Sequence, residues 1–123
     1  MVKKLVSAGN FPFSKAVIHD LKYVMEVSGQ VGLDSTTGKL VEGIEKQTRQ
    51  SLDNIKSILE DEGWSFENIT KVRIYLLDMA DYTKVNEIYK SYFSKDYPAR
   101  VALAVKALPL GALIEIECTA GRD

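Results

Sequence analysis

Hydrophobic residues recur along this chain with two different periods, and the change of period separates strands from helices. Residues 71–77 alternate, with Val72, Ile74 and Leu76 on one face, which is typical of a strand buried on one side. In residues 41–61 the recurring positions are instead three or four apart, which predicts an amphipathic helix. These positions are Ile44, Thr48, Leu52, Ile55 and Leu59.

A second helical pattern follows the strand at 71–77. Asp78 stands where a helix N-cap is expected. The next stripe consists of Tyr82, Val85, Ile88, Tyr89 and Tyr92. Its spacing predicts a helix with one apolar face. This helix is expected to end before Pro98, because proline disfavours a helical conformation at the residue that precedes it.

Short apolar segments predict five more strands. Three precede the first helix, near residues 4–7, 16–18 and 23–27, and two close the chain, near 101–105 and 113–118. The polar segment 19–22 lies between the second and third strands, so a hairpin turn is expected there. The predicted order is therefore strand, strand, strand, helix, strand, helix, strand, strand.

Two helices can cover only one face of a sheet with six strands, so something else must cover the other face. The strand at 101–105 is apolar on both sides, with Val101 and Leu103 on one and Ala102 and Ala104 on the other. Burial on both sides in so small a protein predicts a partner, and a closed homo-oligomer is the simplest one.

Composition narrows the class of protein. The 123 residues form a single expected domain, residues 1–123, with a net charge of −1 and scattered basic side chains, which argues against nucleic-acid binding. No run approaches the roughly 20 apolar residues that span a bilayer, so a cytoplasmic protein without a membrane partner is expected. One cysteine and one histidine argue against disulfides within the chain and against a metal site.

Two charged residues belong to the apolar segments that end the chain, one at the edge of a segment and one within it. Arg100 precedes the strand at 101–105, and Glu115 lies within the strand at 113–118. A guanidinium can bind a substrate carboxylate through two parallel hydrogen bonds, and a nearby glutamate can orient water. A structural ion pair of Arg100 with Glu115 or Glu117 explains the same residues equally well, and Glu117 is expected to be structural.

Five stretches of the chain carry a resemblance to a known family. They are residues 28–30, 47–56, 78–89, 98–102 and 114–117. In these stretches and in their order, the chain resembles the RidA/YjgF family of enamine/imine deaminases. The resemblance implies an α+β fold like that of trimeric chorismate mutase, with a mixed six-stranded sheet, two helices on one face and a homotrimer with sites between neighbours.

The resemblance also implies roles for individual residues. Arg100 matches the arginine that clamps the substrate carboxylate, and Glu115 matches the glutamate that positions the hydrolytic water. Asn86 and Gly29 match residues that line the pocket. Ala102 stands where the family often has cysteine, and only its backbone N–H is expected to matter.

The chain departs from the family in two places. Phe11-Pro12-Phe13-Ser14 replaces the usual Gly-Pro-Tyr-Ser, so Phe13 is expected to keep a ring at the substrate site without its hydroxyl. Glu26 and Arg73 replace residues that are usually apolar and small, and we expect the two to compensate one another as an ion pair.

The function implied is hydrolysis of small 2-enamino or 2-imino acids, such as 2-aminoacrylate or 2-iminopropionate, to 2-keto acids and ammonia. No metal or bound cofactor is needed for this reaction. The alternative is a binding or regulatory protein that senses 2-keto or other carboxylic acids in the same pocket between subunits. A ribonuclease label sometimes attached to the family is disfavoured, because the chain has no basic patch.

Overall fold

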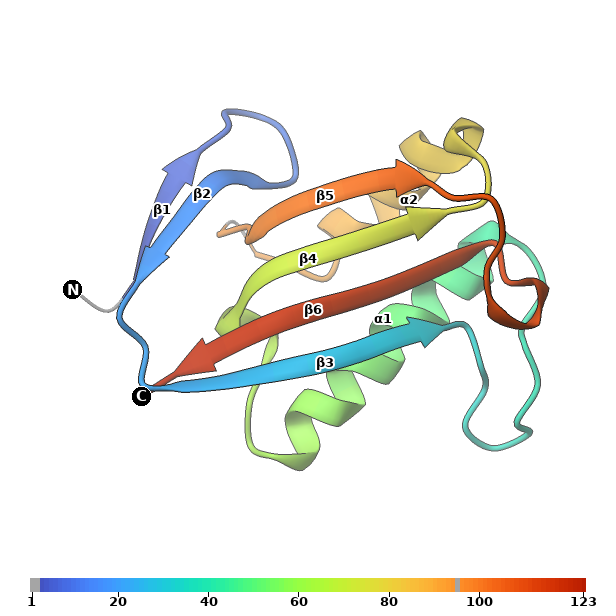
Figure 1. Cartoon of the computed structure of the whole chain (residues 1–123), viewed down its shortest axis with the longest axis horizontal. Helices are drawn as coiled ribbons and strands as arrows, with labels where there is room; N and C mark the ends of the chain where they lie inside the picture. The colour runs from blue at the N-terminus through green and yellow to red at the C-terminus, as the bar shows by residue number, and fades with distance from the viewer. Residues whose placement is uncertain (1–2, 95) are drawn as a thin grey trace.

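A computed structural model describes residues 3–94 and 96–123. Within this range, a six-stranded sheet has the strand order β1-β2-β5-β4-β6-β3 (Figure 1). The strands are β1 Lys3–Ser7, β2 Ser14–His19, β3 Tyr23–Val31, β4 Ile69–Leu76, β5 Ala99–Ala104 and β6 Ile114–Arg122. The helices are α1 Ile44–Asp61 and α2 Tyr82–Lys90, with short 3-10 turns at Phe66–Asn68, Met79–Asp81 and Pro109–Gly111. The predicted order of strands and helices is confirmed.

The sheet is mixed. Strand β5 runs parallel to β4 and to β2, and the pairs β1·β2, β3·β6 and β4·β6 are antiparallel. Both helices lie behind the sheet in Figure 1, so they cover the same face. That face holds the core, as the alternation predicts. Its buried strand residues include Val72, Ile74, Leu76, Ile114 and Ile116, and the helices add Leu52, Ile55, Leu59, Val85 and Tyr89.

The expected hairpin between the second and third strands is wrong. Strand β2 pairs with β1 along its length and has a single paired position with β5, Ser14 with Ala99, whereas β3 pairs with β6. Residues 20–22 instead connect β2, near one edge of the sheet, to β3, which forms the opposite edge (Figure 1). A local pattern of two apolar runs and a polar gap could not reveal this, because the partner of β3 lies at the far end of the chain.

The helix ends agree with the sequence signals. Gly63 follows α1 with φ +77°, a left-handed conformation that glycine adopts without steric cost. The Asp78 carboxylate accepts a hydrogen bond from the Ala80 N–H at 2.9 Å, which caps the 3-10 turn leading into α2. None of the helices in the described part of the chain is long and apolar enough to cross a membrane.

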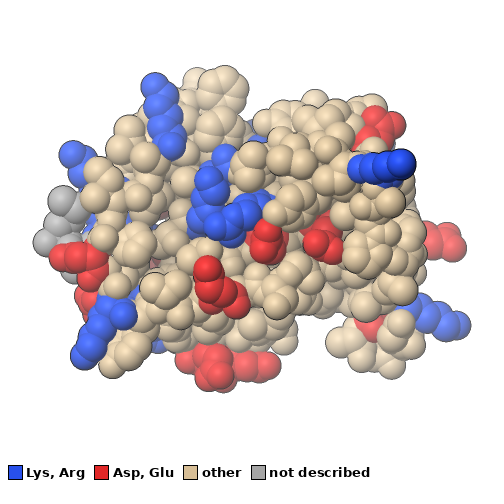
Figure 2. All heavy atoms as spheres, viewed as in Figure 1, with Lys and Arg blue, Asp and Glu red and all other residues tan. Residues whose placement is uncertain are grey.

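The other face of the sheet, here called the open face, carries no helix and is the one seen in Figure 2. Basic and acidic side chains gather in its middle. Charged residues of this face lie at alternate positions of two inner strands and on the neighbouring edge strand: Lys71 and Arg73 on β4, Glu115 and Glu117 on β6, and Glu26 on β3. Val101 and Leu103 lie on the same face and are 38% and 40% exposed. This mixture of charge and exposed apolar surface is consistent with a face that meets a partner.

Candidate functional site

Arg100 is held against α2. It pairs with Val72 of β4, and Val72 is buried under the helices, so Arg100 lies on the covered face. Its Nη2 donates to Oδ1 of Asn86 at 2.8 Å and to the hydroxyl oxygen of Tyr82 at 3.2 Å. Asn86 and Tyr82 are one helical turn apart on α2. The helix therefore fixes the guanidinium through one of its two terminal nitrogens.

Three aromatic rings surround the same guanidinium. Its Cζ lies 4.9 Å from the centre of the Tyr89 ring, 5.4 Å from that of Phe13 and 5.7 Å from that of Tyr82. Contacts at these distances attract a cation to a ring face. Burial raises the pKa of Tyr89, so its hydroxyl stays protonated and neutral beside the charge.

The other terminal nitrogen of Arg100, Nη1, is buried without a hydrogen-bond partner. None of the acidic residues within 3–94 and 96–123 forms an ion pair with this arginine. A buried charged donor without an acceptor is costly, by about 1–3 kcal/mol or more. The Nη1 group therefore lacks an acceptor, and an anion such as a carboxylate is the kind of group that satisfies it.

Glu115 lies against Gly29. A β-bulge interrupts the pairing of β3 with β6 between Val27 and Gln30, and Gly29 falls within it. A methyl group built on the Cα of Gly29 would meet Oε2 of Glu115 at 2.6 Å. Only a residue without a side chain leaves room for this carboxylate, which explains the glycine physically.

Glu117 has a partner of its own. The Tyr75 hydroxyl donates a short hydrogen bond to its Oε1. This bond, followed by burial, raises the pKa of Tyr75, because the neutral hydroxyl is the form that donates. Glu117 is thus engaged with β4, as expected of a structural residue, while Glu115 forms no such bond among the described residues.

Arg100 and Glu115 do not meet within one chain. Strand β4 separates β5 from β6, and Glu115 pairs with Tyr75 while Arg100 pairs with Val72. Because successive residues of a strand face opposite sides, Arg100 lies on the covered face and Glu115 on the open face. The alternative of an ion pair between them within the chain is wrong.

The remaining expected site residues divide between these two places. Asn86 and Phe13 contact Arg100 directly. Ala102 follows two residues along β5 on the same covered face, paired with Ile74 and half-buried. Gly29 lies with Glu115. The expected site residues therefore form two separate groups within the chain: an arginine group, which is Arg100 with Asn86, Phe13 and Ala102, and a glutamate group, which is Glu115 with Gly29.

The expected ion pair between Glu26 and Arg73 is wrong for the single chain. No pair of their charged atoms falls within 4.0 Å. Arg73 instead donates through Nη1 to Oγ1 of Thr119 at 3.4 Å. Both residues line one hollow of about 280 Å³ on the open face, together with Glu117.

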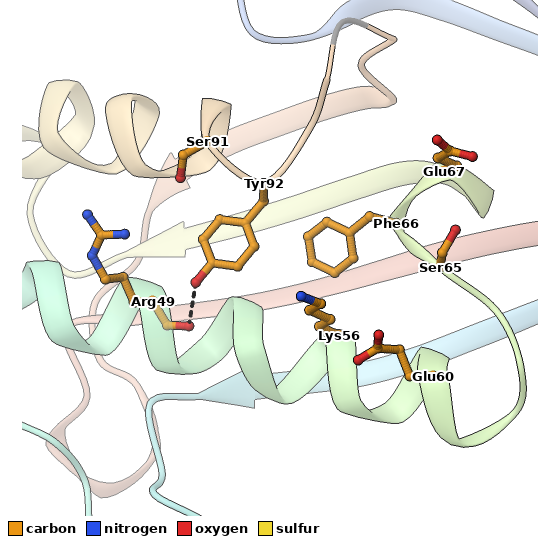
Figure 3. A pocket seen from close by; sticks show the side chains of 8 residues that line it. All are labelled: Arg49, Lys56, Glu60, Ser65, Phe66, Glu67, Ser91 and Tyr92. Atoms are coloured by element: carbon orange, nitrogen blue, oxygen red, sulfur yellow. Dashed lines mark hydrogen bonds between the residues drawn. The ribbon is translucent and has the colours of Figure 1, made fainter.

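A separate hollow of about 430 Å³ lies on the helical side, between α1 and the segment after α2 (Figure 3). Phe66 and Tyr92 point into it, and the Tyr92 hydroxyl donates to the carbonyl of Arg49 at 3.2 Å. None of the expected site residues lines it. The hollow is therefore separate from the arginine group and from the glutamate group.

Sequence reasoning missed the tyrosines that hold the site. Tyr82 and Tyr89 were predicted only as part of the apolar face of a helix, yet both contact Arg100. The available signal was their spacing, since Tyr82, Asn86 and Tyr89 stand at i, i+4 and i+7 and so share one face of α2. Tyr75, which holds Glu117, gave no signal beyond its place in an alternating strand.

The chain is similar to known proteins along most of its length. Residues 4–121 match the family model described as Endoribonuclease L-PSP. The chain is 44% identical over 119 residues to a RutC family protein of Pyrococcus horikoshii, covering 96% of this chain and 84% of the relative. It is 44% identical over 110 residues to the human 2-iminobutanoate/2-iminopropanoate deaminase, covering 89% and 79%.

Solved structures give the same result. The crystal structure of RidA from an Antarctic Psychrobacter superposes with a TM-score of 0.79 at 35% identity, over 94% of this chain and 93% of that one. The family match, the relatives and the fold agree with the motifs that the sequence carries. The chain therefore belongs to the RidA/YjgF family.

Proposed function

We propose that this protein is an enzyme that hydrolyses 2-imino acids, and their 2-enamino tautomers, to 2-keto acids and ammonia. The observation that carries the proposal is the buried Nη1 of Arg100 without a partner. Relatives at 39–44% identity are named 2-iminobutanoate/2-iminopropanoate deaminase, which also favours an enzyme over a protein that only senses carboxylic acids.

In this proposal Arg100 binds the carboxylate of the substrate. Nη2 is already held by Asn86 and Tyr82, so the guanidinium is oriented before the substrate arrives and loses little entropy on binding. The substrate carboxylate completes the hydrogen bonding of Nη1. The aromatic rings around the guanidinium lower the local dielectric constant, which strengthens a charge-assisted hydrogen bond.

Glu115 is the proposed general base. It takes one proton from water as the water oxygen bonds to the imine carbon, and it passes that proton to the nitrogen, which gives a carbinolamine. It then takes the proton of the new hydroxyl group and passes it to the nitrogen, so that the C–N bond breaks, the carbonyl forms and ammonia leaves. The backbone N–H of Ala102 and the backbone at Gly29 are proposed to hold the reacting group. Positioning and acid–base help of roughly 10²-fold or more each suffice for a reactive imine.

A second copy of the chain is part of the proposal. Arg100 and Glu115 belong to opposite faces of one sheet, so a complete site requires the glutamate group of one copy beside the arginine group of another. The exposed Val101 and Leu103 on the open face support such a contact. We infer a homotrimer, as in the expectation from sequence. A cytoplasmic location likewise stays a prediction, which cell fractionation tests.

The test is deamination of 2-iminopropionate generated in place, measured as released pyruvate and ammonia. Arg100→Ala is expected to remove the activity, and Arg100→Lys to lower it by about a hundredfold, because a lysine keeps the charge but loses the planar fork. Arg122→Ala is the matched control, since Arg122 is exposed and bonds only the Gly63 carbonyl and the Trp64 ring. Parent activity in a folded Arg100→Ala variant would contradict the proposal.

A further inference from the structure

We infer that the hollow on the helical side (Figure 3) binds a short peptide with free termini and an apolar residue between them. Its walls come from α1, from the 3-10 turn before β4 and from the residues that follow α2. Neither Arg100 nor Glu115 lines it. Peptide binding is therefore separate from the proposed deaminase reaction.

Four charged side chains on the walls of this hollow are separated by sign. Arg49 and Lys56 lie about two helical turns apart on α1 and share one face of the helix. Glu60 follows on the same face, and Glu67 belongs to the 3-10 turn. In Figure 3, Arg49 lies at one end of the hollow, both glutamates lie at the other, and Lys56 lies between. The charges of the lining thus cancel in sum, but the hollow has a positive and a negative end.

Neither Arg49 nor Lys56 has an ion-pair partner among residues 3–94 and 96–123. On α1 the cation precedes the acid in both pairs at i, i+4, which is the less favourable order on a helix. These pairs are Arg49 with Asp53 and Lys56 with Glu60. The Asp53 carboxylate instead accepts a hydrogen bond from the Tyr92 hydroxyl at 2.7 Å. The two cations can therefore bind a carboxylate from outside the chain.

Two aromatic rings form the middle of the hollow. Phe66 and Tyr92 are half-buried, with ring centres 5.7 Å apart and planes inclined by 31°. The Tyr92 ring is held in place by its hydroxyl group, which donates to Asp53 and to the Arg49 carbonyl. The hollow therefore combines apolar rings with charged ends, which suits a ligand that has an apolar side chain over the rings and opposite charges at its two ends.

The spacing of the charges agrees with a peptide of about three residues. Because each helical residue rises about 1.5 Å, the point midway between Arg49 and Lys56 lies about 11 Å along α1 from Glu60. An extended chain spans at most about 3.3–3.6 Å per residue, so about three residues join a carboxylate at the cations to an ammonium group at the glutamates. The volume of about 430 Å³ is that of a small-molecule site.

Isothermal titration calorimetry of the full chain with the peptide Gly-Phe-Gly tests this binding. Three altered peptides each lack one feature: the N-acetylated peptide lacks the ammonium group, the C-terminal amide lacks the carboxylate, and Gly-Gly-Gly lacks the ring. The protein variants are Lys56→Gln and Glu67→Gln, which each remove one charge from the hollow. Lys84→Gln is the control, since Lys84 is exposed on α2 and does not line the hollow.

We expect Gly-Phe-Gly to bind and each blocked end to weaken binding roughly fivefold, because exposed charge pairs contribute modestly. Gly-Gly-Gly should bind roughly tenfold more weakly, since the contact between phenyl group and rings is lost. Glu67→Gln should weaken binding of Gly-Phe-Gly but have little further effect on the acetylated peptide, and Lys56→Gln should relate to the amide in the same way. Lys84→Gln should change nothing.

Other outcomes overturn the inference. Full affinity of the amide would identify the occupant as the N-terminus of a longer chain, and full affinity of the acetylated peptide would identify it as a C-terminus. Loss of binding in Arg100→Ala would place the peptide at the proposed deaminase site. A protein that hydrolyses imines but binds none of the peptides would refute this inference alone, whereas one that binds Gly-Phe-Gly but hydrolyses no imine would refute the proposed function alone.

Discussion

The two faces of the sheet follow opposite rules, although they are built from alternate residues of the same strands. On the covered face, β4 contributes Val72, Ile74 and Leu76, which are all buried. On the open face the same strand contributes Lys71, Arg73 and Tyr75, which are half-buried. A side chain that breaks the rule of its face therefore requires an explanation.

Each face has such exceptions. Arg100 is a charge on the covered face, fixed by α2 and left with a free buried donor. Val101 and Leu103 are apolar residues left exposed on the open face. The first exception indicates a ligand and the second a partner, because a buried charge needs an anion and an apolar patch needs cover. Arg100 and Val101 are neighbours on β5, yet the first indicates where a ligand binds and the second where another copy of the chain binds.

The largest effect is expected from a charge placed in the apolar patch of the open face. Leu103→Asp should weaken self-association by roughly 10²-fold to several thousandfold, since burying an uncompensated charge between copies costs about 3–5 kcal/mol. The deaminase activity should fall with it at dilute protein, because the proposed site is completed by a second copy. Light scattering and the activity of the same dilution series measure this.

The control for assembly is Ile18→Asp, at a residue 50% exposed on β2. It adds the same charge to a similarly exposed residue of β2 that lies four positions beyond Ser14, where β2 has its one pairing with β5, and it should leave the oligomer intact. A Leu103→Asp protein that stays assembled and active would show that this part of the open face has no partner. It would contradict the conclusion that the exposed apolar residues of the open face mark a contact between copies.

The next largest effect is a loss of stability on the covered face, which a comparison of two isoleucines of different burial measures. Ile74 is 0% exposed and Ile18 is 50% exposed. Ile74→Ala should lower the free energy of unfolding by about 2–5 kcal/mol because it leaves a cavity under the helices. Ile18→Ala should change it by about 0.5 kcal/mol or less. Chemical denaturation of both variants is the measurement, and equal losses would contradict the assignment of the core to one face.

Sequence reasoning succeeded where the signal was local. The alternation of residues 71–77 correctly assigned Val72, Ile74 and Leu76 to one face, and Asp78 and Gly63 marked helix boundaries that the structure has. It failed where pairing was decided by distant segments. The β2–β3 hairpin was wrong because β3 pairs with the last strand of the chain.

The candidate site shows the same division. Arg100 and Glu115 were both identified because they are charged residues next to or within apolar segments. The sequence did not predict that they lie on opposite faces of the sheet. That separation depends on β4 lying between β5 and β6 and on the register of each pair. Neither is encoded near the two residues. The support from Tyr82 and Tyr89 was visible as helical spacing, yet only the register of β5 against β4 brings Arg100 beneath that face of α2.

A smaller effect is expected where β3 approaches the glutamate. Gly29→Ala should lower kcat/KM by about tenfold, because the added methyl group displaces the Glu115 carboxylate by more than the tolerance of a positioned base. Its carboxylate is the flexible end of a side chain, so the fold should survive. Ser28→Ala, in the same bulge, is the control and should have little effect.

A second substitution makes the test of Gly29 specific. In Gly29→Ala, the further change Glu115→Asp shortens the acid and relieves the contact, so the two losses should be less than additive. Additive losses would mean that Gly29 and Glu115 act independently, and Gly29 would then matter for the backbone alone.

The smallest effect is a pH dependence that distinguishes neighbouring residues of β6. Glu117 faces the open side, and Cys118 faces the core, where burial raises the pKa of its thiol to about 12 from 9.0. A raised pKa means that the folded state retains a proton that the unfolded chain releases above pH 9. Stability from this thiol is therefore complete below pH 9 and is lost as the pH rises toward 12.

Cys118→Ala removes this dependence. The difference in unfolding free energy between the unaltered protein and Cys118→Ala should shrink by about 1.4 kcal/mol between pH 8 and pH 10, since one pH unit above the unfolded pKa corresponds to that amount. Both proteins should still lose stability in alkali, because the pKa values of Tyr75, Tyr89 and Tyr92 are also raised. Parallel profiles from pH 8 to pH 10 would mean that Cys118 is open to water, and so that the covered face is not sealed at β6.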